Sequence, residues 1–132
     1  MTHAALLITA VLFGGSILYA FGFAAFVFNA LPAETAGPLI RKAFPHFYLF
    51  VFAAAALAAA LSAPFDRTSA IALAAVAVTV VPARQVLMPA INAASDAGHA
   101  ARFRALHSLS VAITLAHIAV AGIALVRVAQ AI

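Results

Sequence analysis

Long runs without a charged residue divide this chain into four segments. These runs cover residues 1–33, 43–65, 68–83 and 105–126. A helix that crosses a bilayer needs about 20 consecutive apolar residues. Three runs are long enough as they stand, and the run from residue 68 reaches this length if it continues past Arg84 to Met88. The pattern predicts four membrane-spanning helices, over approximately residues 4–30, 45–62, 69–88 and 105–127.

The composition agrees with this prediction. Of the 132 residues, 67% are hydrophobic and 8% are charged, and the mean hydropathy is +1.18. A soluble domain carries roughly 25% charged residues, so this chain has too few to cover a water-facing surface. We therefore expect an all-α fold, an integral membrane four-helix bundle in which residues 1–132 form a single domain.

The basic residues are scattered over the ends of the predicted spans. The net charge is +4 and the pI is near 10.8. Seven dispersed cations do not form the clustered patch that binds nucleic acid, and we expect them to contact anionic lipid headgroups instead. The predicted partners are membrane lipids, together with further copies of the chain or the subunits of a larger membrane complex, and no nucleic acid is expected.

The distribution of Lys and Arg also predicts how the helices are oriented. With four spans, the first and third loops lie on one side of the membrane, and the second loop lies with both termini on the other. Two cations, Arg67 and Arg127, belong to the side of the termini, and five belong to the opposite side: Arg41, Lys42, Arg84, Arg102 and Arg104. Because cytoplasmic loops carry an excess of Lys and Arg, we expect loops one and three in the cytoplasm and both termini in the periplasm, with the protein in a bacterial inner membrane.

The fourth predicted span carries a stripe of polar side chains, which we call the polar face. At about 100° per residue its members fall within about 80° of one another on the helix: His107, Ser110, Thr114 and His117. Polar groups inside a bilayer are costly, so they mark either hydrogen bonds between helices or a functional role. One hypothesis is that the polar face points inward and fixes the register of the bundle. The other is that it lines a route for a cofactor, a substrate or protons.

Three histidines are candidates to bind a heme. They are His46, at the entry to the second span, and His107 and His117 of the fourth. The last two lie about 15 Å apart along a helix, too far to ligate one iron, whereas His46 and His107 belong to the same side of the membrane. The chain has no HExxH motif and no histidine pair at i, i+4. We therefore expect no metal site and no cofactor, with heme b as the alternative.

A second group of polar residues lies at the predicted cytoplasmic side, and we call it the interfacial polar network: Glu34, Arg84, Asn92 and Asp96. We expect ion pairs and hydrogen bonds that hold the loops together. Each carboxylate is expected to pair with a nearby arginine: Glu34 with Arg41 or Arg84, and Asp96 with Arg102 or Arg104. No serine triad, Gly-rich phosphate loop or carboxylate dyad is present, so no catalytic residue is expected.

The start of the fourth span resembles a known family. It reads Phe103-x-x-Leu106-His107-Ser108-Leu109-Ser110-x-x-Ile113-Thr114-Leu115. This is similar to the last helix of the four-span domain of unknown function in transmembrane protein 205 and its bacterial relatives, which typically reads Phe-x-x-Leu-His-Gly-Leu-Ser with an Asn four positions after the Ser. Ser108 stands where glycine is usual, and Thr114 where asparagine is usual.

Two further segments carry the same resemblance. They are Leu31-Pro32, after a glycine-containing first helix, and Phe44-Pro45-His46-Phe47-Tyr48 at the entry to the second. The resemblance spans nearly the whole chain. It implies a multi-pass membrane protein with no established enzymatic activity or cofactor, and it singles out His107 and Ser110.

Three hypotheses about function follow. The favoured one is a protein without catalysis, either a structural or accessory subunit or a self-associating bundle, because the helices are rich in Ala and Gly. The second is a heme-binding or redox membrane protein that uses the core histidines. The third is a small transporter or permeability factor lined by the polar face. We expect that the protein is not an enzyme.

Overall fold

The computed structural model describes all 132 residues and forms four long helical rods. The first comprises α1 (Thr2–Ile17), the π-helical segment η1 (Leu18–Phe23) and α2 (Ala24–Ala30), and the second is α3 (Ala33–Ser62). The third comprises α4 (Arg67–Pro82), the π-helical η2 (Ala83–Leu87) and α5 (Met88–Asp96), and the fourth is α6 (Ala100–Gln130). Each rod is long and apolar enough to cross a membrane. The prediction of an all-α four-helix membrane bundle is confirmed.

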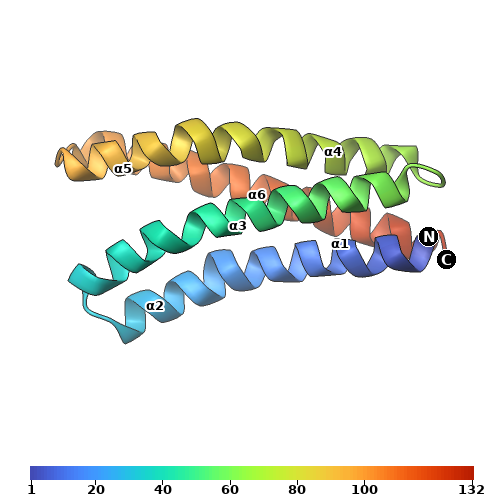
Figure 1. The fold of residues 1–132 in the computed structure, drawn as a ribbon, viewed down its shortest axis with the longest axis horizontal. Helices are drawn as coiled ribbons and strands as arrows, with labels where there is room; N and C mark the ends of the chain where they lie inside the picture. The colour runs from blue at the N-terminus through green and yellow to red at the C-terminus, as the bar shows by residue number, and fades with distance from the viewer.

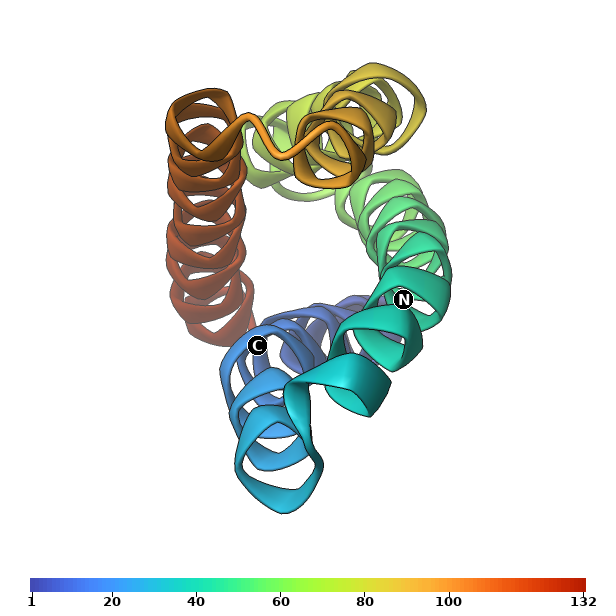
Figure 2. The same cartoon turned by 90° about the vertical axis from the view of Figure 1, so that its left-hand side faces the viewer.

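The rods run antiparallel (Figure 1). Both termini lie at one end of the bundle, together with the turn between α3 and α4, whereas the α2–α3 and α5–α6 connections lie at the other. Seen along its length (Figure 2), the bundle is a ring in which the rod of α1 lies between α3 and α6, and the rod of α4 lies opposite, also between α3 and α6. Loops one and three therefore share one end, as four spans require.

Small side chains form much of the core where the rods meet. The alanines in the later half of α3 are buried, among them Ala55, Ala58 and Ala59, and they belong to one buried cluster with Ala121 and Ala124 of α6. Large apolar side chains instead cover the outside of the bundle. Because lipid tails are as apolar as leucine, helices in a bilayer gain most from close approach, which small residues allow.

The two ends of the third rod have well-defined caps. At its start, Asp66 is the N-cap: its carboxylate accepts a hydrogen bond from the Ser69 N–H at 3.2 Å and another from the Ser69 hydroxyl at 2.6 Å. The helix therefore begins one residue after Asp66, at Arg67. At the other end, Gly98 has a φ of +69°, and the His99 N–H donates to the Ala94 carbonyl at 3.0 Å. This left-handed turn ends α5 after Asp96.

The helix α3 begins at Ala33, twelve residues before the start that the sequence predicts. The prediction followed the charge-free run that begins at residue 43, yet α3 also includes the charged residues before it and continues through Pro38 and Pro45. In Figure 1, the first part of α3 diverges from α5 and α6 and stays close to α2. The bundle is therefore closed at the end that carries the termini and splayed at the other.

Candidate functional site

The polar face of α6 points toward α3 and α4. The Ser110 hydroxyl lies 3.1 Å from the hydroxyl of Tyr48 on α3, and either group can donate the hydrogen bond. About two helical turns further along, Nε2 of His117 lies 2.8 Å from Oγ1 of Thr79 on α4. Thr114 lies between them and is half-buried. These contacts agree with the hypothesis that the polar face points inward and forms hydrogen bonds to other helices.

Aromatic packing positions Tyr48 for its contact. The ring of Tyr19 on η1 stacks on Phe47 with centroids 5.1 Å apart, and its hydroxyl donates to the Ala43 carbonyl at 2.8 Å. Phe44 packs edge-on against both Tyr19 and Tyr48. This cluster holds the splayed part of α3 against the first rod and leaves the Tyr48 hydroxyl directed toward α6.

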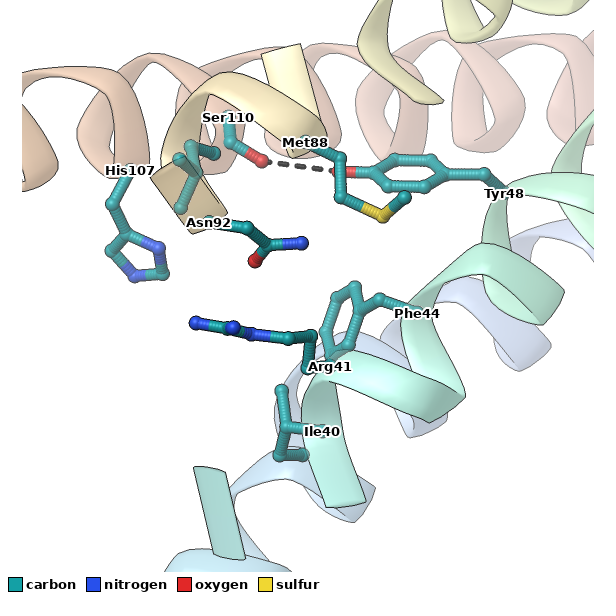
Figure 3. Close-up of a pocket in the computed structure, with 9 residues that line it drawn as sticks. Ile40, Arg41, Phe44, Tyr48, Met88, Asn92, His107 and Ser110 are labelled. Atoms are coloured by element: carbon teal, nitrogen blue, oxygen red, sulfur yellow. Dashed lines mark hydrogen bonds between the residues drawn. The ribbon is translucent and has the colours of Figure 1, made fainter. Parts of the chain in front are cut away.

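A cleft lies between the splayed parts of α3, α5 and α6, and we call it the interfacial cleft. It has an outer part of about 590 Å³ and an inner part of about 110 Å³. Five residues line both parts: Ile40, Arg41, Ile91, Asn92 and His107. In Figure 3, the side chains of Arg41, Asn92 and His107 extend into the same space, and the hydrogen-bonded Tyr48 and Ser110 lie at its inner end.

His107 differs from the rest of the polar face. It is exposed in the interfacial cleft, its ring stacks on Phe103 with centroids 5.5 Å apart, and it forms no hydrogen bond with another residue. The sequence places His107 on the inward side of α6. Because the bundle is splayed at this level, that side borders a cavity rather than a neighbouring helix.

An ion pair crosses the interfacial cleft. Nη1 of Arg41 on α3 donates to Oδ1 of Asp96 on α5 at 2.8 Å, and the two side chains are 40% and 65% exposed. The expected pairing of Asp96 with Arg102 or Arg104 is wrong. The residues before Pro45 were expected to belong to a loop, but they are helical and bring Arg41 beside α5.

The other members of the interfacial polar network lie apart. Glu34 is exposed and forms no ion pair, which contradicts its expected pairing with Arg41 or Arg84. Arg84 is half-buried on η2, where its Nε donates to the Pro45 carbonyl at 3.2 Å. Asn92 lines the cleft without a hydrogen bond to the protein. In place of the predicted network, Asp96 forms an ion pair, Arg84 forms a hydrogen bond to the backbone, and Asn92 has no partner in the protein.

A second ion pair, at the end that carries the termini, was not predicted. Arg127 near the end of α6 donates from Nε and Nη2 to the two carboxylate oxygens of Asp66, at 3.1 and 2.9 Å. These bonds, followed by those from Ser69, hold the pKa of the Asp66 carboxyl well below its usual range. Two features of the sequence mark these residues: the Asp-x-x-Ser spacing of a helix N-cap, and an arginine in the last turn of a helix. Neither feature indicates that the start of α4 and the end of α6 meet.

The three candidate heme ligands lie in different places. His46 lines an apolar groove of about 680 Å³ on the side of the bundle formed by η1 and α3. His107 lines the interfacial cleft, and His117 is bonded to Thr79. No cavity described above contains two of them, and no group of three or more metal-ligating side chains is present. The expectation that no cofactor is bound stays a prediction.

The fold and its polar contacts define an integral membrane protein, a four-helix bundle with a polar cleft at one end. A family model described as "Domain of unknown function (DUF4149)" matches residues 7–100, which cover the first three rods except for the start of α1, so the chain belongs to this family. The match ends where α6 begins. Comparison with curated proteins found no match, and comparison with solved structures found none either.

Proposed function

We propose that this protein acts without catalysis, as a self-associating bundle or an accessory subunit of a larger membrane assembly, and that it associates through the outer side of α6. The polar groups within the spans support a role without catalysis. Ser110 and His117 are already engaged with Tyr48 and Thr79. Both bonds join one helix to another and so stabilise the bundle, and no third side chain is bonded to His117 to orient it as a base.

The observation that carries the proposal is a stripe on the outer side of α6, which we call the small-residue face. Its members are all exposed: Ala101, Ala105, Ser108, Ala112, Ala116 and Ala119. At about 100° per residue they fall within about 80° of one another, on the side of α6 opposite the polar face. In a bilayer, such a face lets a second helix approach closely.

The coverage of α6 supports the same conclusion. Only 11% of its most apolar segment is buried inside the bundle, against 22% to 28% for the other three rods. An exposed helix surrounded by lipid usually carries large apolar side chains, as the outside of α4 does with Ile71 and Val78. The small-residue face of α6 departs from this pattern over the helical turns nearest the interfacial cleft.

Cross-linking in native membranes tests the proposal, because the chain has no cysteine of its own. The variant Ala112→Cys places a thiol on the small-residue face, and Val78→Cys places the matched control on the exposed side of α4. Oxidation should produce a disulfide-linked dimer from Ala112→Cys alone. Equal dimer formation by both variants would contradict the proposal. The same holds if neither variant forms a dimer and neither is cross-linked to a partner chain, because both self-association and the accessory-subunit role would then lack a contact at this face.

We also propose the orientation that the charges predict, with the α2–α3 and α5–α6 connections in the cytoplasm of a bacterial inner membrane and both termini in the periplasm. The support is the excess of Lys and Arg at the splayed end of the bundle. We further propose that the chain is related to the four-span proteins that resemble transmembrane protein 205. That proposal rests on the motif from Phe103 to Leu115, which lies outside the matched residues. Alignment with the fourth helices of such proteins should pair His107 with their histidine without a gap.

A further inference from the structure

We propose that the interfacial cleft binds an anionic amphiphile, which is a molecule with a phosphate or carboxylate headgroup and an acyl tail. This inference is independent of self-association, because the cleft lies on the opposite side of α6 from the small-residue face. The binding residues are Arg41, Asn92 and His107, which line both parts of the cleft.

The charge of the cleft matches an anion. Two cations, Arg41 and Lys42, line its outer part, and Asp96 is the one acidic residue there. The carboxylate of Asp96 accepts one hydrogen bond from the Arg41 guanidinium, through Nη1. A guanidinium has five N–H donors, so the remaining ones can hold a phosphate or carboxylate in a two-point contact. Figure 3 shows the guanidinium extended toward the space beside Asn92 and His107.

Two further polar groups beside the arginine have no hydrogen-bond partner in the protein. Neither the amide of Asn92 nor the ring of His107 is hydrogen-bonded to another residue, although both side chains point into the cleft. The cleft also ends at hydroxyl groups, because Tyr48 and Ser110 close its inner part. Several hydrogen-bonding groups thus converge on one space, which is the arrangement of a ligand site rather than of a solvated surface.

The remaining walls are apolar and indicate an acyl tail. Phe28, Ile40, Ile91 and Phe103 line the outer part beside the polar groups. The volume of about 590 Å³ lies in the range of ligand-binding cavities. Phe28 is 57% exposed on the outside of α2, so a tail that leaves the cleft there stays against an apolar surface. A small inorganic anion would leave this wall uncovered, which favours an amphiphile.

A fluorescent reporter in the cleft can measure this binding. The chain contains no tryptophan, so Phe103→Trp introduces a single indole in the cleft wall. The reporter protein, in mild detergent, is titrated with brominated phosphatidylglycerol, with brominated phosphatidylcholine, and with unlabelled phosphatidylglycerol or inorganic phosphate as competitors. We expect quenching by the anionic lipid at about a tenfold lower mole fraction than by the zwitterionic one, as a charged hydrogen-bonded contact provides.

Three substitutions in the reporter background identify the site. Arg41→Gln should remove most of the preference for the anionic lipid, whereas Arg104→Gln, a cation at the same end that does not line the cleft, should retain it. Asp96→Asn should strengthen anionic binding, because it frees Arg41 from its partner while keeping the size of the side chain. If Arg41 and Asp96 served only to hold α3 and α5 together, Asp96→Asn would not strengthen anionic binding while Arg41→Gln weakened it. Asp96→Asn therefore tests the proposal even if Arg41→Gln fails to fold.

The proposal is overturned by equal quenching from the two lipids, by equal losses in Arg41→Gln and Arg104→Gln, or by weaker anionic binding in Asp96→Asn. Displacement of the lipid by inorganic phosphate at similar concentration would identify a site for free anions and would overturn the assignment to an amphiphile. Competition by unlabelled phosphatidylglycerol alone would support it.

Discussion

Tyr48 on α3 and Ser110 on α6 join their hydroxyl groups at 3.1 Å, at the point where the closed part of the bundle meets the interfacial cleft. Toward the termini the rods pack through alanines. Toward the α2–α3 and α5–α6 connections they diverge around Arg41 and His107. The pair therefore joins α3 to α6 at the inner end of the interfacial cleft.

Removing either hydroxyl should weaken the contact between α3 and α6 and so lower the stability of the bundle. We expect Tyr48→Phe and Ser110→Ala each to lower the free energy of unfolding by about 0.5–1.5 kcal/mol, because each leaves the other hydroxyl without its partner. A double-mutant cycle, measured by unfolding in mixed detergent micelles, should give a coupling of about 0.6 kcal/mol. Ser108→Ala, on the small-residue face, is the matched control and should change stability little. Strictly additive losses would show that the hydroxyls do not interact.

The two histidines of the polar face should respond differently to substitution. His117 is bonded to Thr79 of α4, so His117→Ala should lower the free energy of unfolding in detergent by about 1 kcal/mol. His107 has no such bond and borders the cleft, so His107→Ala should leave thermal stability nearly unchanged. If His107→Ala were the more destabilising of the two, our description of the cleft at that level would be wrong.

The ion pair of Asp66 and Arg127 should make stability depend on pH. A carboxyl whose pKa is lower in the folded protein than in the unfolded chain stabilises the fold above the unfolded pKa. Since an unfolded aspartate titrates near a pKa of about 3.9, this contribution should be complete above about pH 5 and should decline progressively below about pH 4.

Thermal unfolding in detergent over this acidic range tests the assignment. The wild type should lose stability more steeply than Asp66→Asn, which lacks the titrating group, while Glu34→Gln should follow the wild type because Glu34 has no ion pair. Parallel curves for the wild type and Asp66→Asn would exclude Asp66 as a source of the pH dependence.

Labelling of single cysteines should reveal the orientation in the membrane. In intact bacterial cells, Pro64→Cys in the α3–α4 turn should react with a membrane-impermeant maleimide, because we place this turn in the periplasm. Ala97→Cys in the α5–α6 connection should react only after the cells are permeabilised. Both positions are exposed, so the reversed pattern would mean the opposite orientation, and labelling of both in intact cells would contradict four crossings.

Some features of this protein could be predicted from local sequence alone. Charge-free runs predict the four helices because membrane crossing depends mainly on length and apolarity. The spacing of Ser110, Thr114 and His117 predicts a shared face because helical periodicity is a local property. Gly98 marks the end of α5 for a similar reason, since its positive φ suits a residue without a Cβ atom.

The sequence did not predict which distant residues meet. Arg41 and Asp96 are 55 residues apart in the chain, and Asp66 and Arg127 are 61 apart, so both pairs depend on how whole rods are placed beside one another. The charge-free run that begins at residue 43 also gave no sign that α3 starts at Ala33.

The interfacial cleft exists because of that placement. The sequence by itself determined that four apolar helices cross the membrane and that α6 turns a polar side inward. Only the tertiary structure decided that His117 meets a partner on α4 while His107 faces a cavity, because the bundle is closed toward the termini and splayed at the level of His107.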